Sequence, residues 1–309
     1  MSPFTDLPAR AVSALGEEKL IAAIRGWLGS ASPPPPRGIG DDCAVLPRLR
    51  GRPLLTVDPV IFGRHFDEDD PARAVGAKLL KRNLSDVAAM GGRPVAAVVA
   101  LSLAPTVDRR WLEQFYRGLA AAAPRYRTPV VGGDVAQAQG GFVATLTLAG
   151  EATSRAVARA GARAGDWIYV TGILGGSLPS GRHLNFEPRL AEGAWLARRP
   201  AVRAMLDVSD GLAKDLRALT PAGCQAALAA DSVPRLRGVT LAAALGDGED
   251  YELAFALAAS ADRRAFERAW RRAFPRVRLT GIGRFVRRGR RPADAIDLSA
   301  FRGYEHLRA

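Results

Sequence analysis

Residues 83–91 read Asn-Leu-Ser-Asp-Val-Ala-Ala-Met-Gly and close an apolar stretch that begins after Asp70-Pro71. Aspartate is a favourable residue before a helix, and proline is tolerated in the first helical turn. The glycines Gly91-Gly92 should end this helix. Asn83 and Asp86 are three residues apart, so they share one helical face. The stretch therefore predicts a helix that carries a polar, carboxylate-bearing face near its C-terminal end.

Four further Asp-bearing motifs and one lone aspartate accompany this stretch. They are Gly40–Asp42, Gly132–Asp134, Asp207–Gly211 and Gly248–Asp250, with Asp58 after the apolar run Leu54–Val57. We expect them where strands end or helices begin, because glycine lets a ligand approach the backbone there. Carboxylates gathered at one place repel each other, and divalent cations relieve that repulsion. Mg²⁺ takes oxygen ligands and bridges phosphates, so the pattern predicts a Mg²⁺-dependent enzyme that acts on phosphates.

Composition sets limits on the class of protein. The 309 residues are enough for one large domain or two ordinary ones, and the hydrophobic share of 48% is normal for an α/β protein. We find no apolar run of the roughly 20 residues that span a bilayer, and no signal peptide is predicted. The cysteines Cys43 and Cys224 cannot form a disulfide framework, and no Cys/His spacing predicts zinc. We read Cys43 as a small core residue and expect a cytoplasmic protein.

The net charge of +13 comes mainly from arginine, since only four of the 44 basic residues are lysines. The segment Arg263–Arg291, called the Arg-rich region below, holds twelve arginines. One interpretation is a nucleic-acid patch, and the other is the solvated face of a C-terminal helix and hairpin. The aromatic residues of this segment are not interleaved with the arginines in the way that base-stacking platforms would require, which favours the second interpretation.

Helical and strand patterns alternate in both halves of the chain, which favours α/β or α+β domains. Expected helices are Gly16–Trp27, Asp70–Met90, Val107–Ala123, Gly211–Leu219 and Asp262–Phe274. Expected strands are Leu54–Asp58, Val95–Leu103, Val130–Val131, Phe142–Leu148, Trp167–Val170, Ala204–Leu206, Leu253–Leu257, Val277–Gly281 and Gly283–Val286. Leu54–Asp58 is predicted to be buried, and Ser209-Asp210 to cap the helix that follows. Apolar density drops around Glu151–Arg159, which predicts domains over residues 1–152 and 153–309.

The order and spacing of the Asp motifs resembles the thiamine-monophosphate kinase family. The similarity continues through Arg159–Ala162, Gly165–Trp167, Gly248–Leu253 and Gly303–His306, and covers nearly the whole chain from Gly16 onward. That family shares its fold with aminoimidazole ribonucleotide synthetase and selenophosphate synthetase. The resemblance implies ATP- and Mg²⁺-dependent phosphorylation of thiamine monophosphate to thiamine diphosphate. It also implies a two-domain fold in which the N-terminal sheet pairs with that of a second subunit into a barrel, and the C-terminal domain is an αβ sandwich.

The resemblance also assigns roles to single residues. Residues implied to hold Mg²⁺ are Asp41, Thr56, Asp58, Asp86, Asp134, Asp207 and Asp210. Residues implied to bind ATP are Tyr116, Gly133, Asp134, Arg159 and Ser209; those implied to bind substrate are His65, Glu249 and Tyr304. The implied domain roles are ATP and Mg²⁺ binding with dimerisation for residues 1–152, and completion of the active site for residues 153–309. Without the resemblance, His65 reads as a structural loop histidine, Tyr116 as an interior residue and Tyr304 as a packing anchor.

Three departures from the family pattern leave the identity of the phosphoryl acceptor open. Val57 stands where the family usually has a second threonine, and Lys81-Arg82 replace a small apolar pair and either contact phosphate or face solvent. The turn Gly175–Ser177 lacks the usual aspartate, and the segment after it is short. An alternative function is therefore a divergent member of the superfamily that uses ATP on another small phosphate or carbonyl compound. A basic nucleic-acid-binding protein is the third hypothesis.

Overall fold

The computed structural model describes residues 2–305, so His306 of the last motif lies outside the described residues. Contacts between Cα atoms divide the chain into two compact units. The first unit is Met1–Val87 with Arg93–Glu151, and the second is Ala88–Gly92 with Ala152–Ala309. Each unit is described by itself below.

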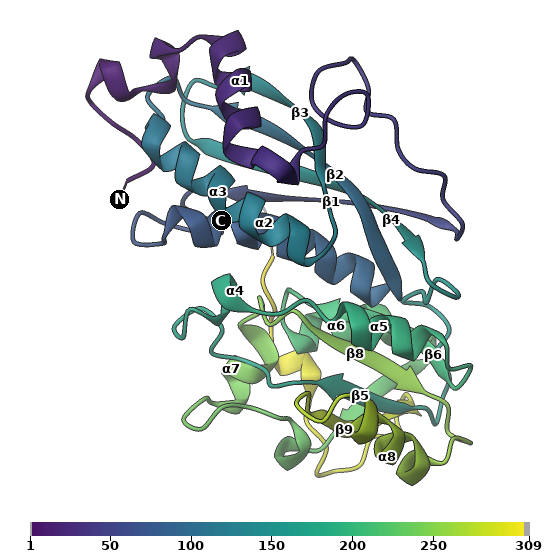
Figure 1. The fold of residues 1–309 in the computed structure, drawn as a ribbon. Helices are drawn as coiled ribbons and strands as arrows, with labels where there is room; N and C mark the ends of the chain where they lie inside the picture. Colours follow the sequence, from purple (N-terminus) through teal and green to yellow (C-terminus); the bar gives the residue numbers. More distant parts are fainter. Residues whose placement is uncertain (1, 306–309) are drawn as a thin grey trace. The chain divides into compact units, whose positions relative to one another are not determined.

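The first unit contains a four-stranded mixed sheet (Figure 1). Its strands are β1 (Pro53–Ile61), β2 (Gly92–Leu103), β3 (Val130–Gln137) and β4 (Phe142–Ala152), in the order β1-β4-β2-β3. Strands β1 and β4 pair antiparallel, whereas β2 and β3 pair parallel. Strand β1 is therefore an edge strand of the unit.

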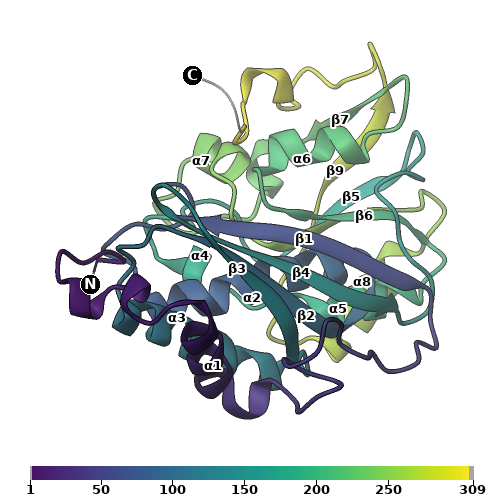
Figure 2. The same cartoon turned by 90° about the horizontal axis from the view of Figure 1, so that it is seen from above.

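Three helices cover one face of this sheet (Figures 1 and 2). They are α1 (Glu17–Leu28), α2 (Ala72–Ala89) and α3 (Arg109–Arg125). Helices α2 and α3 approach closely at Gly76 and Gly118. A Cβ on Gly76 would lie 1.9 Å from the Phe115 carbonyl oxygen, and a Cβ on Gly118 would lie 2.0 Å from the Arg73 carbonyl oxygen. The rings of Trp111, Phe115 and Phe142 pack against one another beneath α3. This packing fixes the helices on which the predicted site residues lie.

The other face of the sheet carries exposed apolar side chains. Leu55 is 76% exposed and Val57 is 57% exposed on β1, and Val98 on β2 is 37% exposed. We call Leu55, Val57 and Val98 the open face. The prediction that Leu54–Asp58 is a buried strand was wrong, because alternate side chains of an edge strand point away from the helices.

The second unit contains a five-stranded sheet in which all pairs are antiparallel. Its strands are β5 (Trp167–Thr171), β6 (Val202–Val208), β7 (Cys224–Leu228), β8 (Glu252–Leu257) and β9 (Leu279–Arg287), in the order β6-β8-β5-β9-β7. The alanine-rich β7 was not predicted, and β9 is one strand where two segments were expected. The Arg-rich region forms a helix, as its second interpretation expected, but the expected hairpin is absent, because β9 pairs with β5 and β7.

Helices cover both faces of the second sheet. They are α4 (Arg182–Asn185), α5 (Leu190–Ala197), α6 (Leu212–Leu219), α7 (Leu241–Gly246) and α8 (Arg263–Ala273). Short 3₁₀ helices occupy Pro8–Arg10, Val12–Ala14, Gly29–Ala31, Ala230–Ser232 and Leu298–Ala300. Leu216 of α6 packs with Leu206 and Phe285 in one core, and Trp270 of α8 packs with Phe255 in the other. The predicted α/β class is confirmed, with a mixed N-terminal sheet and an antiparallel C-terminal one.

Several local predictions were wrong. Asp58 and Asp134 lie inside β1 and β3 rather than at strand ends, whereas Asp86 lies in α2, as predicted, and Asp207 is the last but one residue of β6. Ser209-Asp210 does not cap α6: Gly211 occupies the N-cap position and no side chain caps it. Cys43 is exposed rather than part of a core. Within residues 2–305, no helix is both long and apolar enough to cross a membrane.

Candidate active site

The junction of β1 and the last turns of α2 gathers three predicted metal ligands. The alternation of β1 turns Thr56 and Asp58 to the helix-covered face, and Thr56 Oγ1 donates a hydrogen bond of 2.5 Å to Asp86 Oδ2. Asn83 lies one turn before Asp86 and donates its amide to the Leu79 carbonyl at 2.9 Å. The polar helix face predicted from residues 83–91 thus points at β1.

Arg82 connects α2 to the neighbouring stretch of β1. Its guanidinium donates to the Pro59 carbonyl at 2.6 Å and lies 3.6 Å from Asp58 Oδ1. The Arg82 side chain is only 11% exposed, so the interpretation that it faces solvent was wrong. Arg82 therefore holds the strand segment that carries Asp58.

Arg82→Ala should raise the Mg²⁺ concentration needed for half-maximal turnover by about tenfold, because groups that orient metal ligands are typically worth about 10–100-fold in affinity or activity. The measurement is turnover against Mg²⁺ concentration, with a thermal melt to check folding. Arg25→Ala, on the exposed side of α1, is the matched control. An unchanged Mg²⁺ dependence in a folded Arg82→Ala variant would refute the positioning role.

A second set of predicted residues lines one apolar pocket of about 80 Å³ in the first unit. Tyr116 from α3 and Gly133 and Asp134 from β3 all line it, together with aliphatic residues of α1. Burial raises the pKa of Tyr116 well above its usual value, so this hydroxyl stays protonated. The pocket therefore offers apolar walls with a carboxylate at its border.

Gly133 is required by the sheet itself. A Cβ at this position would lie 2.0 Å from the Val99 carbonyl oxygen, whereas a Cβ on Gly132 would meet only Val98 Cγ1 at 3.4 Å. Gly133→Ala should therefore separate β3 from β2 and cost about 1–3 kcal/mol of unfolding free energy. Gly132→Ala is the matched control and should stay within about 1 kcal/mol of the parent protein. Denaturant unfolding of both variants tests this, and equal stability of the two would contradict it.

Asp41 and His65 occupy loops of the first unit. Asp41 is exposed, and its backbone forms an isolated β-bridge with Ile39. Ile39 lines the same apolar pocket as Tyr116. His65 is buried, and its Nδ1 accepts a hydrogen bond from the Ile61 N–H at 3.1 Å. Lys78 Nζ donates to the His65 carbonyl at 2.7 Å. The His65 ring is thus held in a fixed orientation just after β1.

The second unit brings four predicted residues together. The Glu249 N–H donates to the Ser209 carbonyl at 2.7 Å, and the Tyr304 N–H donates to the Asp210 carbonyl at 2.8 Å. Lys214 Nζ bridges Asp210 Oδ2 and the Tyr304 carbonyl, at 2.6 Å each. Sequence reasoning missed Lys214, although it lies in the first turn of α6, four residues after Asp210, and this spacing is a signal for such a pair.

Asp215 is a further residue that sequence reasoning missed. Its carboxylate accepts the N–H groups of Ser209 at 3.1 Å and of Asp210 at 3.0 Å. Burial raises the pKa of Asp215 to about 7, and the charge of Asp210 adds to this shift. Two other predicted site residues belong to this unit: Asp207 is buried in β6, and Arg159 is exposed. Asp215 thus shapes the backbone that presents Ser209 and Asp210.

The donor chemistry fits a hard cation, although no complete metal cluster is present. Within residues 2–305, no group of three or more His, Cys, Asp or Glu side chains is gathered closely enough to hold a metal ion. The side-chain oxygens of Thr56, Asp58 and Asp86 at the β1–α2 junction are hydroxyl and carboxylate oxygens, the ligand type that Mg²⁺ prefers.

Comparison with known proteins decides the family. Residues 40–152 match the family model described as "AIR synthase related protein, N-terminal domain". Over 273 residues the chain is 37% identical to the thiamine-monophosphate kinase of Salmonella typhimurium, covering 78% of this chain and 82% of that one. The chain belongs to the thiamine-monophosphate kinase family. The kinase of this family from Rhodopirellula baltica is 35% identical, again over 78% of this chain and 82% of the relative. The family predicted from the motifs is confirmed.

Solved structures of this kinase family agree. The Stenotrophomonas maltophilia thiamine-monophosphate kinase superposes with a TM-score of 0.73 at 31% identity, covering 86% of this chain and 93% of that one. The structure described as "AaThiL complexed with AMPPCP and TMP" superposes with a TM-score of 0.65 at 28% identity, covering 96% and 98%. Hydrogenase maturation protein HypE, at 20% identity and a TM-score of 0.72 over 92% and 90%, shares the fold alone.

Proposed function

We propose that this chain transfers the γ-phosphoryl group of ATP to thiamine monophosphate and so forms thiamine diphosphate. The observation that carries the proposal is the membership of the thiamine-monophosphate kinase family over most of the chain. A solved relative bound to AMPPCP and TMP supports ATP and thiamine monophosphate as the two ligands.

The proposed reaction joins two anions, which defines what the site must do. Two unit charges 4 Å apart repel by about 4 kcal/mol at an effective dielectric constant of 20. The acceptor phosphate is already ionised, so no general base or nucleophile is required. Positioning and charge neutralisation therefore supply most of the catalysis, as in other phosphoryl transfers.

The proposed metal ligands are the oxygen-bearing residues of both units. Thr56, Asp58 and Asp86 at the β1–α2 junction, with Asp41 and Asp134, would hold Mg²⁺ in the first unit. Asp207 and Asp210 would do so in the second. Mg²⁺ held by these residues would supply positive charge that offsets the charge of the phosphates. The oxygens of Thr56 and Asp86 are already 2.5 Å apart, which supports this assignment.

The proposed ligand contacts follow the same division. In the first unit Tyr116, Gly133 and Asp134 would bind ATP, since they line one pocket whose apolar walls suit a base. Arg159 and Ser209 of the second unit would also bind ATP. His65, Glu249 and Tyr304 would contact thiamine monophosphate. The first unit, residues 1–152 of the predicted division, would bind ATP and Mg²⁺ and dimerise, and the second would complete the active site.

A homodimer through the open face is part of this proposal. Leu55, Val57 and Val98 are large apolar side chains on one sheet face, and exposed apolar patches of this kind mark interaction sites. A second copy of the same sheet would cover them and form the barrel that the family resemblance implies. A cytoplasmic location stays a prediction of the sequence.

Nucleic acid is not a proposed partner. The Arg-rich region forms α8 and β9, and the buried aromatic residues Phe266 and Trp270 of α8 face the sheet core. Arginines on the outer side of such a helix are hydrated, so their number needs no nucleic-acid ligand to explain it. Most single-stranded nucleic-acid sites also need aromatic side chains on which the bases stack.

The experiment that tests the proposed function measures thiamine diphosphate by chromatography after incubation with ATP, Mg²⁺ and thiamine monophosphate. Product that requires both ATP and Mg²⁺ is expected. Other small phosphates and carbonyl compounds serve as parallel acceptors. Absence of thiamine diphosphate together with ATP consumption on another acceptor would favour the divergent enzyme instead.

A further inference from the structure

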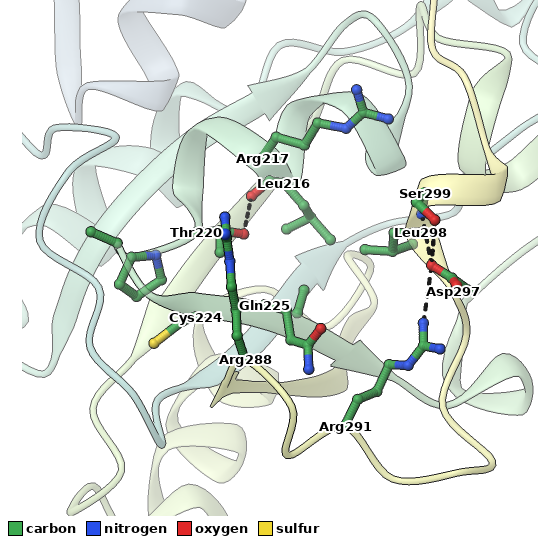
Figure 3. A pocket seen from close by; sticks show the side chains of 13 residues that line it. Leu216, Arg217, Thr220, Cys224, Gln225, Arg288, Arg291, Asp297, Leu298 and Ser299 are labelled. Carbon is green, nitrogen blue, oxygen red and sulfur yellow. Dashed lines mark hydrogen bonds and ion pairs between the residues drawn. The ribbon is translucent and has the colours of Figure 1, made fainter.

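The second unit contains a large basic cavity beside the edge strand β7 (Figure 3). Its volume is about 700 Å³, within the range of about 300–1,000 Å³ that is usual for small-molecule sites. The lining comes from α6, β7, the residue after β9 and the segment that leads into the 3₁₀ helix Leu298–Ala300. Arg217, Arg288 and Arg291 lie around it, and two of them belong to the Arg-rich region.

The three arginines differ in how their charge is compensated. Arg291 forms an ion pair of 3.0 Å with Asp297, and Asp297 also accepts hydrogen bonds from Ser299 N–H and Oγ. These contacts hold the pKa of Asp297 at about 2, so this pair stays neutral as a whole. Asp297 is the one acidic side chain among the described residues that line the cavity.

The other two guanidinium groups keep their charge. Arg217 donates only to the Phe301 carbonyl, at 3.2 Å, among the contacts within the described part of the chain. The Arg288 side chain makes no hydrogen bond or ion pair with any residue of the described range, and in Figure 3 it extends past Gln225 towards Thr220. Both arginines are exposed, so their charges attract anions into the cavity.

Apolar side chains complete the wall of the cavity. Leu216 is fully buried in the core of α6 and the sheet, and Leu298 packs against that core. Pro221 and Leu298 are half-buried and Ala222 is exposed, so these three lining residues present apolar surface to the cavity. A ligand with a polyanionic part and a compact organic part would therefore contact both the arginines and the apolar side chains of the cavity.

We propose that this cavity is a second ligand site, which binds a small diphosphate ester. Arg217 and Arg288 would each hold one phosphate, because the planar guanidinium fork matches phosphate oxygens. The organic part would pack on Pro221, Ala222 and Leu298, the accessible apolar residues of the lining. Single-stranded nucleic acid fits less well, since no aromatic residue lies among the described lining residues. None of these residues belongs to the proposed kinase site, so the inference stands independently of it.

The test is titration calorimetry in Mg²⁺-free buffer with EDTA, where the carboxylates of the proposed kinase site do not attract phosphates. Inorganic pyrophosphate is the first probe, and ADP and thiamine diphosphate are the second and third. One pyrophosphate should bind per chain, with affinity reduced at least about tenfold in the double variant Arg217→Ala/Arg288→Ala. Arg290→Ala, an exposed arginine outside the cavity lining, is the matched control and should bind like the parent.

The outcomes separate the parts of the proposal. Tighter binding of ADP or thiamine diphosphate than of pyrophosphate, lost in the double variant, supports the apolar wall and identifies the source of the diphosphate. Equal binding of all three overturns the role of the apolar wall. Pyrophosphate affinity that the double variant leaves unchanged, or no binding at millimolar concentration, overturns the site. Binding of an RNA oligonucleotide through Arg217 and Arg288 without pyrophosphate binding overturns it in favour of a nucleic-acid surface. Both arginines are exposed, so the variants should fold, and circular dichroism checks this.

Discussion

Asp86→Asn should lower the ATP-dependent formation of thiamine diphosphate by about 10²–10³-fold, the usual cost of losing one preorganised charge-stabilising group. Asparagine has nearly the same shape as aspartate and can still accept the hydrogen bond from Thr56 Oγ1. It lacks the negative charge that Mg²⁺ binding needs. The loss should therefore appear in turnover and in Mg²⁺ dependence, and the melting temperature should change little.

The matched control for this prediction is Asp69→Asn. Asp69 is an exposed aspartate of the same unit, before α2, and the control should retain the activity of the parent protein. Parent-like activity in Asp86→Asn would show that this carboxylate is not a metal ligand. A large fall in melting temperature would instead show that Asp86 serves the fold.

Leu55→Glu/Val57→Glu should convert a homodimer into monomers. Burial of a Leu or Val side chain is worth about 1.5–3 kcal/mol, and a twofold interface would bury each residue twice. Replacing all four side chains with charged ones should therefore cost roughly 6–12 kcal/mol of association free energy. Analytical ultracentrifugation at micromolar concentration measures the outcome.

The control for the dimer prediction is Leu7→Glu. Leu7 is 56% exposed but lies outside the sheet, so the control should sediment as the parent does. A parent protein that sediments as a monomer, or a dimer that survives the double substitution, would contradict the proposed interface. Secondary structure should be unchanged in both variants, because all three side chains are exposed.

Local signals predicted α1, α2, α3, α6 and α8, whereas the burial of strands depended on distant partners. Helix α2 was predicted nearly to its ends, because Asp70-Pro71 and Gly91-Gly92 mark its boundaries within the sequence itself. Strand β1 was wrongly predicted to be buried, because only the sheet order reveals that it is an edge strand. Strand β7 was missed because Cys-Gln-Ala-Ala-Leu has little strand propensity, and it is stabilised by pairing with β9.

The candidate site was predictable as a set of residue types but not as contacts. The order of the Asp motifs led to the correct family, yet it could not reveal that Arg82 holds the Asp58 segment. Gly133 was expected as a ligand-binding residue, and the sheet adds a second reason, its close approach to Val99. The basic cavity could not be foreseen, since Arg217 and Arg288 are brought together by α6 and the β7–β9 pair.

The most direct test of the central claim follows the phosphoryl group itself. The protein is incubated with Mg²⁺, thiamine monophosphate and ATP labelled in the γ-phosphoryl group, and both products are isolated. The account predicts one labelled thiamine diphosphate for each ADP formed, with the label in the terminal phosphoryl group. Release of ADP with the label recovered only as inorganic phosphate, and none in thiamine diphosphate, would contradict it.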